Sequence, residues 1–217
     1  MSEKFTGLIA VRKGSQRVKN KNIRDFCGTS LLEIKVKQAI NCKLINEVVV
    51  SSDCDQMLNL ATQLGAKTHK RKEFYCSNTV PMNSVYEHLA KSASCEHIVY
   101  LHATSPFLTD KSLEDSIIKY KEKIKNGYDS LATVEIIKKY LWYENKPINY
   151  DPSMHPRSQD LPDFMALNFA INIIKKNDMI KYKNILGNKF YPYVLDDIEG
   201  FDIDEEFDFL LAKKIYR

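Results

Sequence analysis

Residues 6–24 read TGLIAVRKGSQRVKNKNIR, an apolar run that passes directly into a basic loop. Residues 6–11 are β-rich and predict a strand. The small residues Gly14 and Ser15 predict a turn with exposed backbone N–H groups, and flanking cations add charge-assisted hydrogen bonds to phosphate oxygens. The loop therefore predicts a nucleotide phosphate site, and a solvated basic loop is the alternative. It lacks the spacing of a P-loop or a dinucleotide fingerprint. Six cations lie within thirteen residues: Arg12, Lys13, Arg17, Lys19, Lys21 and Arg24.

The rest of the chain alternates strand-like and helix-like segments. The runs EVVVS (47–51) and HIVYL (97–101) are typical of strands buried on both faces. Asp110 is a plausible helix N-cap, because Leu113 and Ile117 follow it at helical spacing. Repeated β-α units predict an α/β fold with a mostly parallel sheet, in which ligands bind outside the carboxyl ends of the strands. Further strands are expected at 130–137 and from residue 164, and helices at about 30–42, 54–64, 83–92, 110–126 and 204–216.

Length and composition indicate one globular domain over residues 1–217, with 44% apolar and 28% charged residues. A net charge of +4 does not require a nucleic-acid partner. The five cysteines include no CxxC pair, which argues against a zinc ribbon. No apolar run approaches the ~18–20 residues that cross a bilayer. The opening residues MSEKF do not resemble a secretory signal. We therefore expect a cytoplasmic protein without a membrane partner.

Residues 138–163 interrupt the alternation. They are rich in Tyr, Pro, Asn and Asp and show no clean period. An irregular segment of this length within a compact domain is typical of a lid, or of an arm that reaches a partner subunit. A linker packed on the surface is the alternative.

Near the carboxyl end, residues 201–204 read FDID. In an extended segment the side chains of Asp202 and Asp204 project to one face. Two carboxylates on one side suit Mg²⁺, which binds one or two protein carboxylates together with phosphates and water. The alternative for Asp204 is to cap the helix that follows.

Several motifs in the chain have counterparts, in the same order, in one known family. AVRKGSQRVKNKN (10–22) resembles the pattern PARxGSKxxxxKN, and LHATSPF (101–107) resembles LQPTSPL. RSQDLP (157–162) resembles RQDLP, and FDIDEEFDF (201–209) resembles DIDTxxDF. On these residues the chain resembles the acylneuraminate cytidylyltransferase family, the CMP-sialic acid synthetases and their relatives. Three shorter similarities accompany these motifs. VVVSSD (48–53) resembles VSTD, and Asn168 and Ala170 match NGA. The segment that begins at Arg71 is similar to the RP stretch of the family, with Ser77 and Ser84 at matching spacing.

The resemblance implies a Mg²⁺-dependent reaction in which CTP and a nine-carbon or similar 2-keto sugar acid give a CMP-sugar and pyrophosphate. It implies a three-layer α/β/α nucleotide-binding (Rossmann-like) domain, with residues 138–163 as a small arm that builds a homodimer. Such products serve bacterial surface glycans. The implied catalytic residues are Arg12, Lys21, Asp202 and Asp204, of which the two aspartates would bind the metal. The implied nucleotide-binding residues are Ala10, Arg12, Gly14, Ser15, Lys21, Asn22, Arg71 and Ser84. The implied substrate-binding residues are His102, Thr104, Ser105, Arg157, Gln159 and Asn168.

The sequence departs from the family pattern mainly on the sugar side. His102 and Ala103 stand where the family has Gln-Pro, Phe169 replaces the glycine of NGA, and Asn172 replaces an aromatic residue. A pocket that loses hydrogen-bonding groups can reject a substrate by orders of magnitude. In the phosphate loop, Gln16 replaces a usual lysine, and Arg12 and Lys21 are retained. The sequence thus leaves the identity of the acid open.

Three other functions are compatible with parts of the sequence. A sugar-1-phosphate nucleotidyltransferase using another nucleoside triphosphate would share the fold and the Mg²⁺ chemistry. A non-catalytic nucleic-acid-binding module would use the basic loop, but it gives no role to Asp202 and Asp204. A substrate-binding relative without turnover is disfavoured because Arg12, Lys21 and both aspartates are present.

Overall fold

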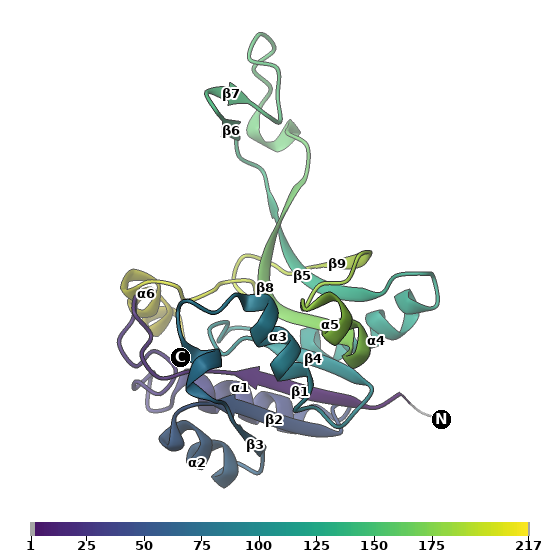
Figure 1. Cartoon of the computed structure of the whole chain (residues 1–217). Coiled ribbons are helices and arrows are strands. Elements are labelled where there is room, and N and C mark those ends of the chain that lie inside the picture. Colours follow the sequence, from purple (N-terminus) through teal and green to yellow (C-terminus); the bar gives the residue numbers. More distant parts are fainter. Residues whose placement is uncertain (1–2, 217) are drawn as a thin grey trace.

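The computed structural model describes residues 3–216, which form a seven-stranded sheet covered by helices on both faces (Figure 1). The strand order is β3-β2-β1-β4-β8-β5-β9. Neighbours are parallel except that β8 runs antiparallel to both β4 and β5. The expected mostly parallel sheet is therefore confirmed. The strands are β1 (Phe5–Ala10), β2 (Glu47–Ser52), β3 (Lys67–Lys70), β4 (His97–Leu101), β5 (Ser130–Ile137), β8 (Phe164–Lys175) and β9 (Phe190–Val194).

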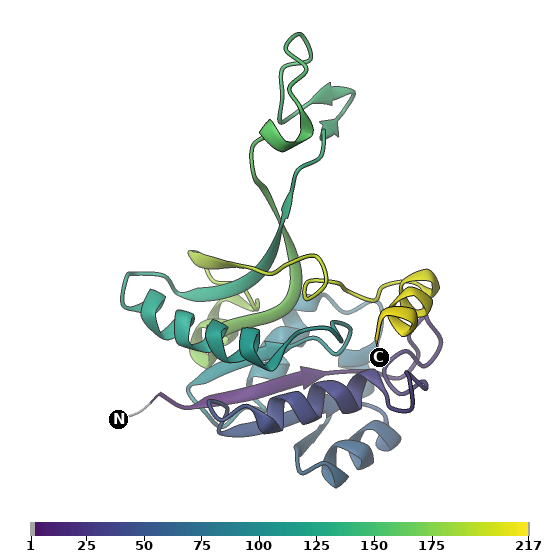
Figure 2. The ribbon, with the colours of Figure 1, turned by 180° about the vertical axis from the view of Figure 1, so that it is seen from behind.

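The helices form the two outer layers of a three-layer α/β/α arrangement. Leu32, Met57 and Leu113 bring α1, α2 and α4 into one buried cluster with the sheet. Leu89 and Met179 bring α3 and α5 into a second cluster on the opposite face. Figure 2 shows α1 and α4 in front of the sheet, whereas α3 and α5 lie in front in Figure 1. The helices are α1 (Leu31–Asn41), α2 (Asp55–Gln63), α3 (Met82–Ala90), α4 (Asp110–Ile124), α5 (Lys176–Tyr182) and α6 (Glu206–Ile215), with 3₁₀ turns at Glu73–Cys76 and Ser158–Asp160.

Two helix starts differ from the predicted caps. The N-cap of α4 is Thr109, not Asp110, because Thr109 is extended and its hydroxyl accepts from the backbone N–H of Ser112 at 3.1 Å. The N-cap of α6 is Glu205, not Asp204, and Glu205 and Asp208 form a reciprocal capping box. The alternative role of Asp204 as a cap is therefore wrong.

The strands β3 and β9 and the helix α5 were not predicted. β3 reads KTHK and β9 reads FYPYV, so neither shows an apolar alternation. Both lie at sheet edges, where one side of the strand pairs with β2 or β5 and where Pro192 is tolerated. Their pairing is determined by the neighbouring strand and leaves no pattern in the sequence.

Residues 138–163 leave the domain between β5 and β8 and project away from the sheet as an arm (Figure 1). The arm contains a two-stranded sheet of β6 (Trp142–Tyr143) and β7 (Lys146–Pro147). Large apolar side chains on it are exposed, among them Trp142, Tyr143 and Met154. Within residues 3–216, no helix combines the length and apolar character required of a membrane span.

Candidate active site

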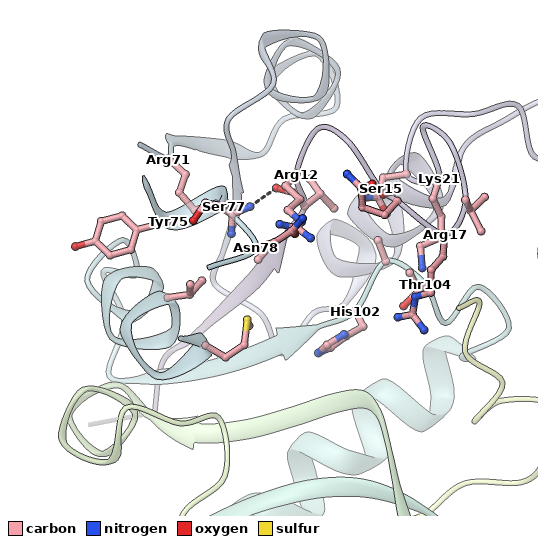
Figure 3. A pocket seen from close by; sticks show the side chains of 18 of the residues that line it. Arg12, Ser15, Arg17, Lys21, Arg71, Tyr75, Ser77, Asn78, His102 and Thr104 are labelled. Carbon is pink, nitrogen blue, oxygen red and sulfur yellow. Dashed lines mark hydrogen bonds between the residues drawn. The ribbon is translucent and has the colours of Figure 1, made fainter. Parts of the chain in front are cut away.

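A cavity of about 430 Å³ lies at the carboxyl ends of β1 and β4 (Figure 3). The two strands are parallel neighbours, so the loops that follow them emerge at the same edge of the sheet. The segment after β3 closes a third wall. The lining includes Arg12, Ser15, Arg17, Lys21, Arg71, Tyr75, Ser77, Asn78, His102 and Thr104.

The loop after β1 is held in place by its neighbours. The backbone N–H of Lys13 donates to Oδ1 of Asp53 at 2.8 Å, which ties the loop to the end of β2. Gly14 adopts φ +78°, a left-handed conformation that glycine takes without a steric penalty. Nη1 of Arg12 donates to the carbonyl oxygen of Cys76 at 2.6 Å. The turn is therefore fixed by the protein itself.

Three cations on this wall, Arg12, Lys21 and Arg71, form no ion pair with residues 3–216. Arg71 is 5% exposed; its Nη2 donates to the Val11 carbonyl at 2.5 Å and its Nε to Sγ of Cys76 at 2.9 Å. Nζ of Lys21 donates to the Ile203 carbonyl at 2.5 Å. Because the hydrogen-bond partners of Arg12, Lys21 and Arg71 are neutral, these cations keep positive charge at the cavity, which favours an anionic ligand. We call this group the β1 side.

Asp202 and Asp204 do not line the cavity, but both carboxylates lie close enough to Lys21 of the β1 side to act on its pKa. Asp202 is half-buried, and burial raises its pKa, while the Thr104 hydroxyl and Lys21 act in the opposite direction. Oδ1 of Asp202 is buried and lacks a hydrogen-bond partner among the described residues. Asp204 pairs with Nη2 of Arg17 at 2.7 Å, and both side chains are largely exposed. Burial lowers the pKa of Lys21, and the two aspartates oppose that shift.

Behind the wall formed by β4 lies a group of buried polar atoms without partners among the described residues, which we call the β4–β8 side; of its residues, His102 lines the cavity itself. Within residues 3–216, the partnerless atoms on this side are Nε2 of His102, Oγ of Ser105, Nδ2 of Asn168 and both side-chain polar atoms of Asn172. Burial is the main cause that lowers the pKa of His102 to about 4, and the positive charge of Lys21 acts in the same direction. His102 is therefore neutral near pH 7 and can donate one hydrogen bond and accept another.

Phe169 stands beside this wall in an unusual backbone conformation. Its φ is +59°, although it is not glycine. A left-handed conformation explains why a glycine suits this position in the family pattern, and a larger side chain here is strained. The Phe169 ring lies 6.0 Å from that of His102, so the substitution changes the β4–β8 side directly.

Residues 6–150 match the model of the cytidylyltransferase family. The chain belongs to the cytidylyltransferase family.

Relatives of this cytidylyltransferase cover most of the chain. It is 28% identical to N-acylneuraminate cytidylyltransferase A of Danio rerio over 98% of the chain, and it spans about half (51%) of that protein's length. It is 25% identical to the CMP-N,N'-diacetyllegionaminic acid synthase of Campylobacter jejuni, covering 94% of the chain and 92% of the relative. A solved CMP:2-keto-3-deoxy-manno-octonic acid synthetase, complexed with CTP, has the same fold with a TM-score of 0.72, 12% identity and 98% coverage of both chains.

Most of the nucleotide-binding residues predicted from the sequence of this cytidylyltransferase meet at the cavity. Gly14 forms the turn beside it, and Ser84 lies on α3 between the lining residues Met82 and Val85. Tyr75 and Asn78 also line the cavity but were missed, because the irregular segment after β3 has no period that predicts its place. The predicted residues in the lining are Ala10, Arg12, Ser15, Lys21, Asn22, Arg71, His102 and Thr104.

Four of the predicted substrate-binding residues lie outside this lining. Ser105 is fully buried behind Thr104, and Asn168 is buried on β8. Gln159 lies on the arm within its 3₁₀ turn, and Arg157 directly precedes that turn and pairs with Asp160 at 2.8 Å. The structure of one chain therefore does not bring these two arm residues to its own cavity.

The donor set of this cytidylyltransferase fits Mg²⁺. The buried, partnerless Oδ1 of Asp202 is a ligand that a hard cation would satisfy, and Asp204 lies two residues away. Among residues 3–216 there is no cluster of three or more His, Cys, Asp or Glu side chains that could hold a metal. Two carboxylates are enough for Mg²⁺ when phosphates and water complete its coordination.

Proposed function

We propose that the protein transfers CMP from CTP to the anomeric hydroxyl of a nonulosonic acid and releases pyrophosphate. The observation that carries this proposal is a cavity lined by the cations of the β1 side, which form no ion pair among the described residues, with the carboxylate of Asp202 close enough to Lys21 to act on its pKa. Relatives named for N-acylneuraminate, legionaminic acid and pseudaminic acid support this substrate class.

The β1 side binds CTP in this proposal. Arg12 and Lys21 hold the triphosphate above the turn of Gly14 and Ser15, whose backbone N–H groups add donors. Arg71, Asn22 and Ser84 contact the nucleoside. Because Arg71 is held by the Val11 carbonyl and Sγ of Cys76, this surface is preorganised and loses little side-chain entropy when the nucleotide binds.

The anomeric oxygen attacks the α-phosphorus, the bond from that phosphorus to the β-phosphate oxygen breaks, and the hydroxyl proton is released. No protein nucleophile is required, so catalysis rests on in-line positioning and on charge stabilisation. Asp202 and Asp204 would hold Mg²⁺, which neutralises charge on the phosphates. Lys21 and Arg12 stabilise the negative charge that develops on the leaving pyrophosphate.

The β4–β8 side binds the sugar acid. Its buried atoms without partners are costly unless a polar ligand satisfies them, and a sugar supplies hydroxyl, amide and carboxylate groups. His102 and Asn168 contribute hydrogen bonds, and Thr104 and Ser105 shape the wall between sugar and phosphate. The product, a CMP-activated acid, would serve the synthesis of a surface glycan.

The arm builds a homodimer in this proposal, and Arg157 and Gln159 of one protomer reach the sugar site of the other. Exposed Trp142 and Tyr143 supply the apolar contact. The double variant Trp142→Ser, Tyr143→Ser should sediment as a monomer where the unaltered protein sediments as a dimer. An unaltered protein that is monomeric at micromolar concentration would contradict the proposed role of the arm.

The test of the function is pyrophosphate release with Mg²⁺ and CTP against a panel of 2-keto sugar acids. GTP and UTP with sugar-1-phosphates are assayed in parallel. Turnover with CTP and one acid identifies the reaction and the substrate. Turnover only with a sugar-1-phosphate would show that the fold supports a different transfer reaction.

A further inference from the structure

A lysine is fully buried in the core without an ion pair. Lys35 on α1 is 0% exposed, whereas lysine is almost never fully buried unless it is paired. Its Nζ donates to Oε1 of Gln38 at 2.7 Å and to the Ser105 carbonyl at 3.0 Å. Within residues 3–216, no carboxylate lies within salt-bridge distance of Lys35.

The neighbouring Gln38 makes a second connection to the same loop. Its Nε2 donates to the Leu108 carbonyl at 2.6 Å and to Oδ1 of Asp110 at 3.2 Å. Two side chains of α1 therefore hold two carbonyl groups of the loop between β4 and α4. Loops carry few internal hydrogen bonds, so these contacts restrict where the loop can lie.

The same loop contains Thr104, which contacts residues 202–204, the segment proposed to bind Mg²⁺. The Thr104 carbonyl accepts from the backbone N–H of Ile203 at 2.9 Å, and the Thr104 hydroxyl lowers the pKa of Asp202. Ser105 follows Thr104 directly, so the anchored carbonyl belongs to the residue next to the one that contacts the site. At its other end α1 is tied to the β1 side, because the N–H of Leu32 donates to the Asn22 carbonyl at 3.0 Å.

We propose that Lys35 is a positioning residue for nucleotidyl transfer: its buried amine fixes the β4–α4 loop through the Ser105 carbonyl and thereby sets Thr104 against Asp202 and Ile203. The catalytic consequence rests on the proposed function. The anchoring of the loop does not depend on it.

The hydrogen bonds of Lys35 suit a neutral amine. A neutral amine has two N–H groups, and Lys35 has two acceptors; an ammonium ion would have a third N–H without a partner. Burial lowers the pKa of Lys35 to about 7, and the carboxylate of Asp110 acts in the opposite direction. An apolar side chain would avoid the penalty of desolvating an amine, but it would leave Oε1 of Gln38 and the Ser105 carbonyl without this donor.

The experiment compares Lys35→Met with the matched control Lys37→Met. Met retains the apolar stem of Lys35 and removes the donors. Lys37 lies two residues away on α1, is 56% exposed and pairs only with Glu33 at the surface. The measurements are kcat, the KM values for CTP and for the acid, the melting temperature, and amide hydrogen exchange of residues 104–109 by mass spectrometry.

For Lys35→Met we expect kcat to fall about tenfold or more, because a small misplacement of a positioned group can cost up to a hundredfold. The KM for CTP should change by less than about twofold, since the β1 side is held by other contacts. The melting temperature at pH 7 should change little, because relief of the desolvation penalty of the amine and loss of the hydrogen bonds to Gln38 and Ser105 act in opposite directions. Exchange of residues 104–109 should accelerate about tenfold. Lys37→Met should match the unaltered protein in all four.

Unchanged kcat in Lys35→Met would overturn the proposal, whether or not the loop exchanges faster. A lower melting temperature with unchanged exchange of residues 104–109 would also overturn it, because Lys35 would then support the core and not the loop. If the unaltered protein turns over no acid on the panel, the proposed function fails. In that case hydrogen exchange still decides whether Lys35 anchors the loop.

Discussion

The β1 side and the β4–β8 side of the cavity differ in how their polar groups are satisfied. On the β1 side Arg12, Arg71 and Lys21 already donate to carbonyl oxygens or to sulfur. On the β4–β8 side His102 and Asn172 keep buried polar atoms without partners in the described chain. The cations of the first surface are held in place by neutral partners before a ligand arrives, whereas the buried polar atoms of the second have no partner among the described residues. Substitutions on the β1 side should therefore change the kinetic parameters for CTP, and substitutions on the β4–β8 side should change those for the acid.

The largest change in kcat is expected at Asp202, whose carboxylate lies close to Lys21 of the β1 side. Asp202→Asn should lower kcat about a thousandfold, because an amide removes the negative charge that holds Mg²⁺ at the phosphates. The measurement is kcat as a function of Mg²⁺ concentration. Asp197→Asn, an exposed carboxylate in the same segment, is the control and should leave kcat unchanged. Full activity in Asp202→Asn, with the same Mg²⁺ dependence, would contradict the metal assignment.

On the β1 side, Lys21→Met should lower kcat/KM for CTP about a hundredfold, since it removes a cation that contacts the phosphates in the transition state. The KM for the acid should hardly change. Steady-state kinetics with each substrate varied in turn separates the two effects. The control is Lys214→Met on the exposed surface of α6. If Lys21→Met raised only the KM for the acid and left kcat/KM for CTP unchanged, the assignment of Lys21 to the triphosphate would be wrong.

On the β4–β8 side, His102→Phe should raise the KM for the acid about tenfold and leave the KM for CTP unchanged, because the hydrogen bonds of the imidazole are lost while its shape is retained. The low pKa of His102, about 4, keeps the imidazole neutral above about pH 5. In the unaltered protein the KM for the acid should therefore not show a histidine titration between pH 6 and pH 8. A clear inflection near pH 6.5 that disappears in His102→Phe would disprove the buried neutral state.

The two sides also differ in how far the sequence predicts them. The β1 side follows from a continuous motif, because Arg12, Gly14 and Lys21 lie in one loop directly after a strand of clear apolar pattern. The strands EVVVS and HIVYL were predicted for the same reason, since burial on both faces leaves a continuous apolar run.

Features that depend on contacts between distant segments were not predicted. KTHK becomes β3 because β2 offers it a pairing edge, and Tyr75 lines the cavity from an irregular segment. The Thr109 cap is a local exception: its hydroxyl accepts from the N–H of Ser112, and the sequence offered Asp110 at the next position as well. Lysine on a helix is usually exposed, so the sequence does not indicate that Lys35 is buried. Only the packing of α1 against the β4–α4 loop shows its burial.

The smallest effect concerns Lys35 and the pH dependence of stability. In the unfolded chain its pKa returns to about 10.5, while burial lowers the pKa of Lys35 to about 7 in the folded protein. Between these values the unfolded chain binds the proton that the folded chain has lost, so the free energy of unfolding rises with pH. From pH 7 to pH 8 the gain should be about 1 kcal/mol relative to Lys35→Met, which has no such group.

Urea unfolding of both proteins at pH 7 and at pH 8 measures this difference, and the variant cancels the titration of all other groups. If the two proteins changed in parallel between these pH values, Lys35 would have to keep its proton in the core. A buried ammonium would then need an acceptor for its third N–H, and the hydroxyl of Ser105, which is buried without a partner among the described residues, lies on the same loop as the anchored carbonyl. The pH dependence therefore distinguishes an anchor of two hydrogen bonds from one of three, and it does so without any assay of activity.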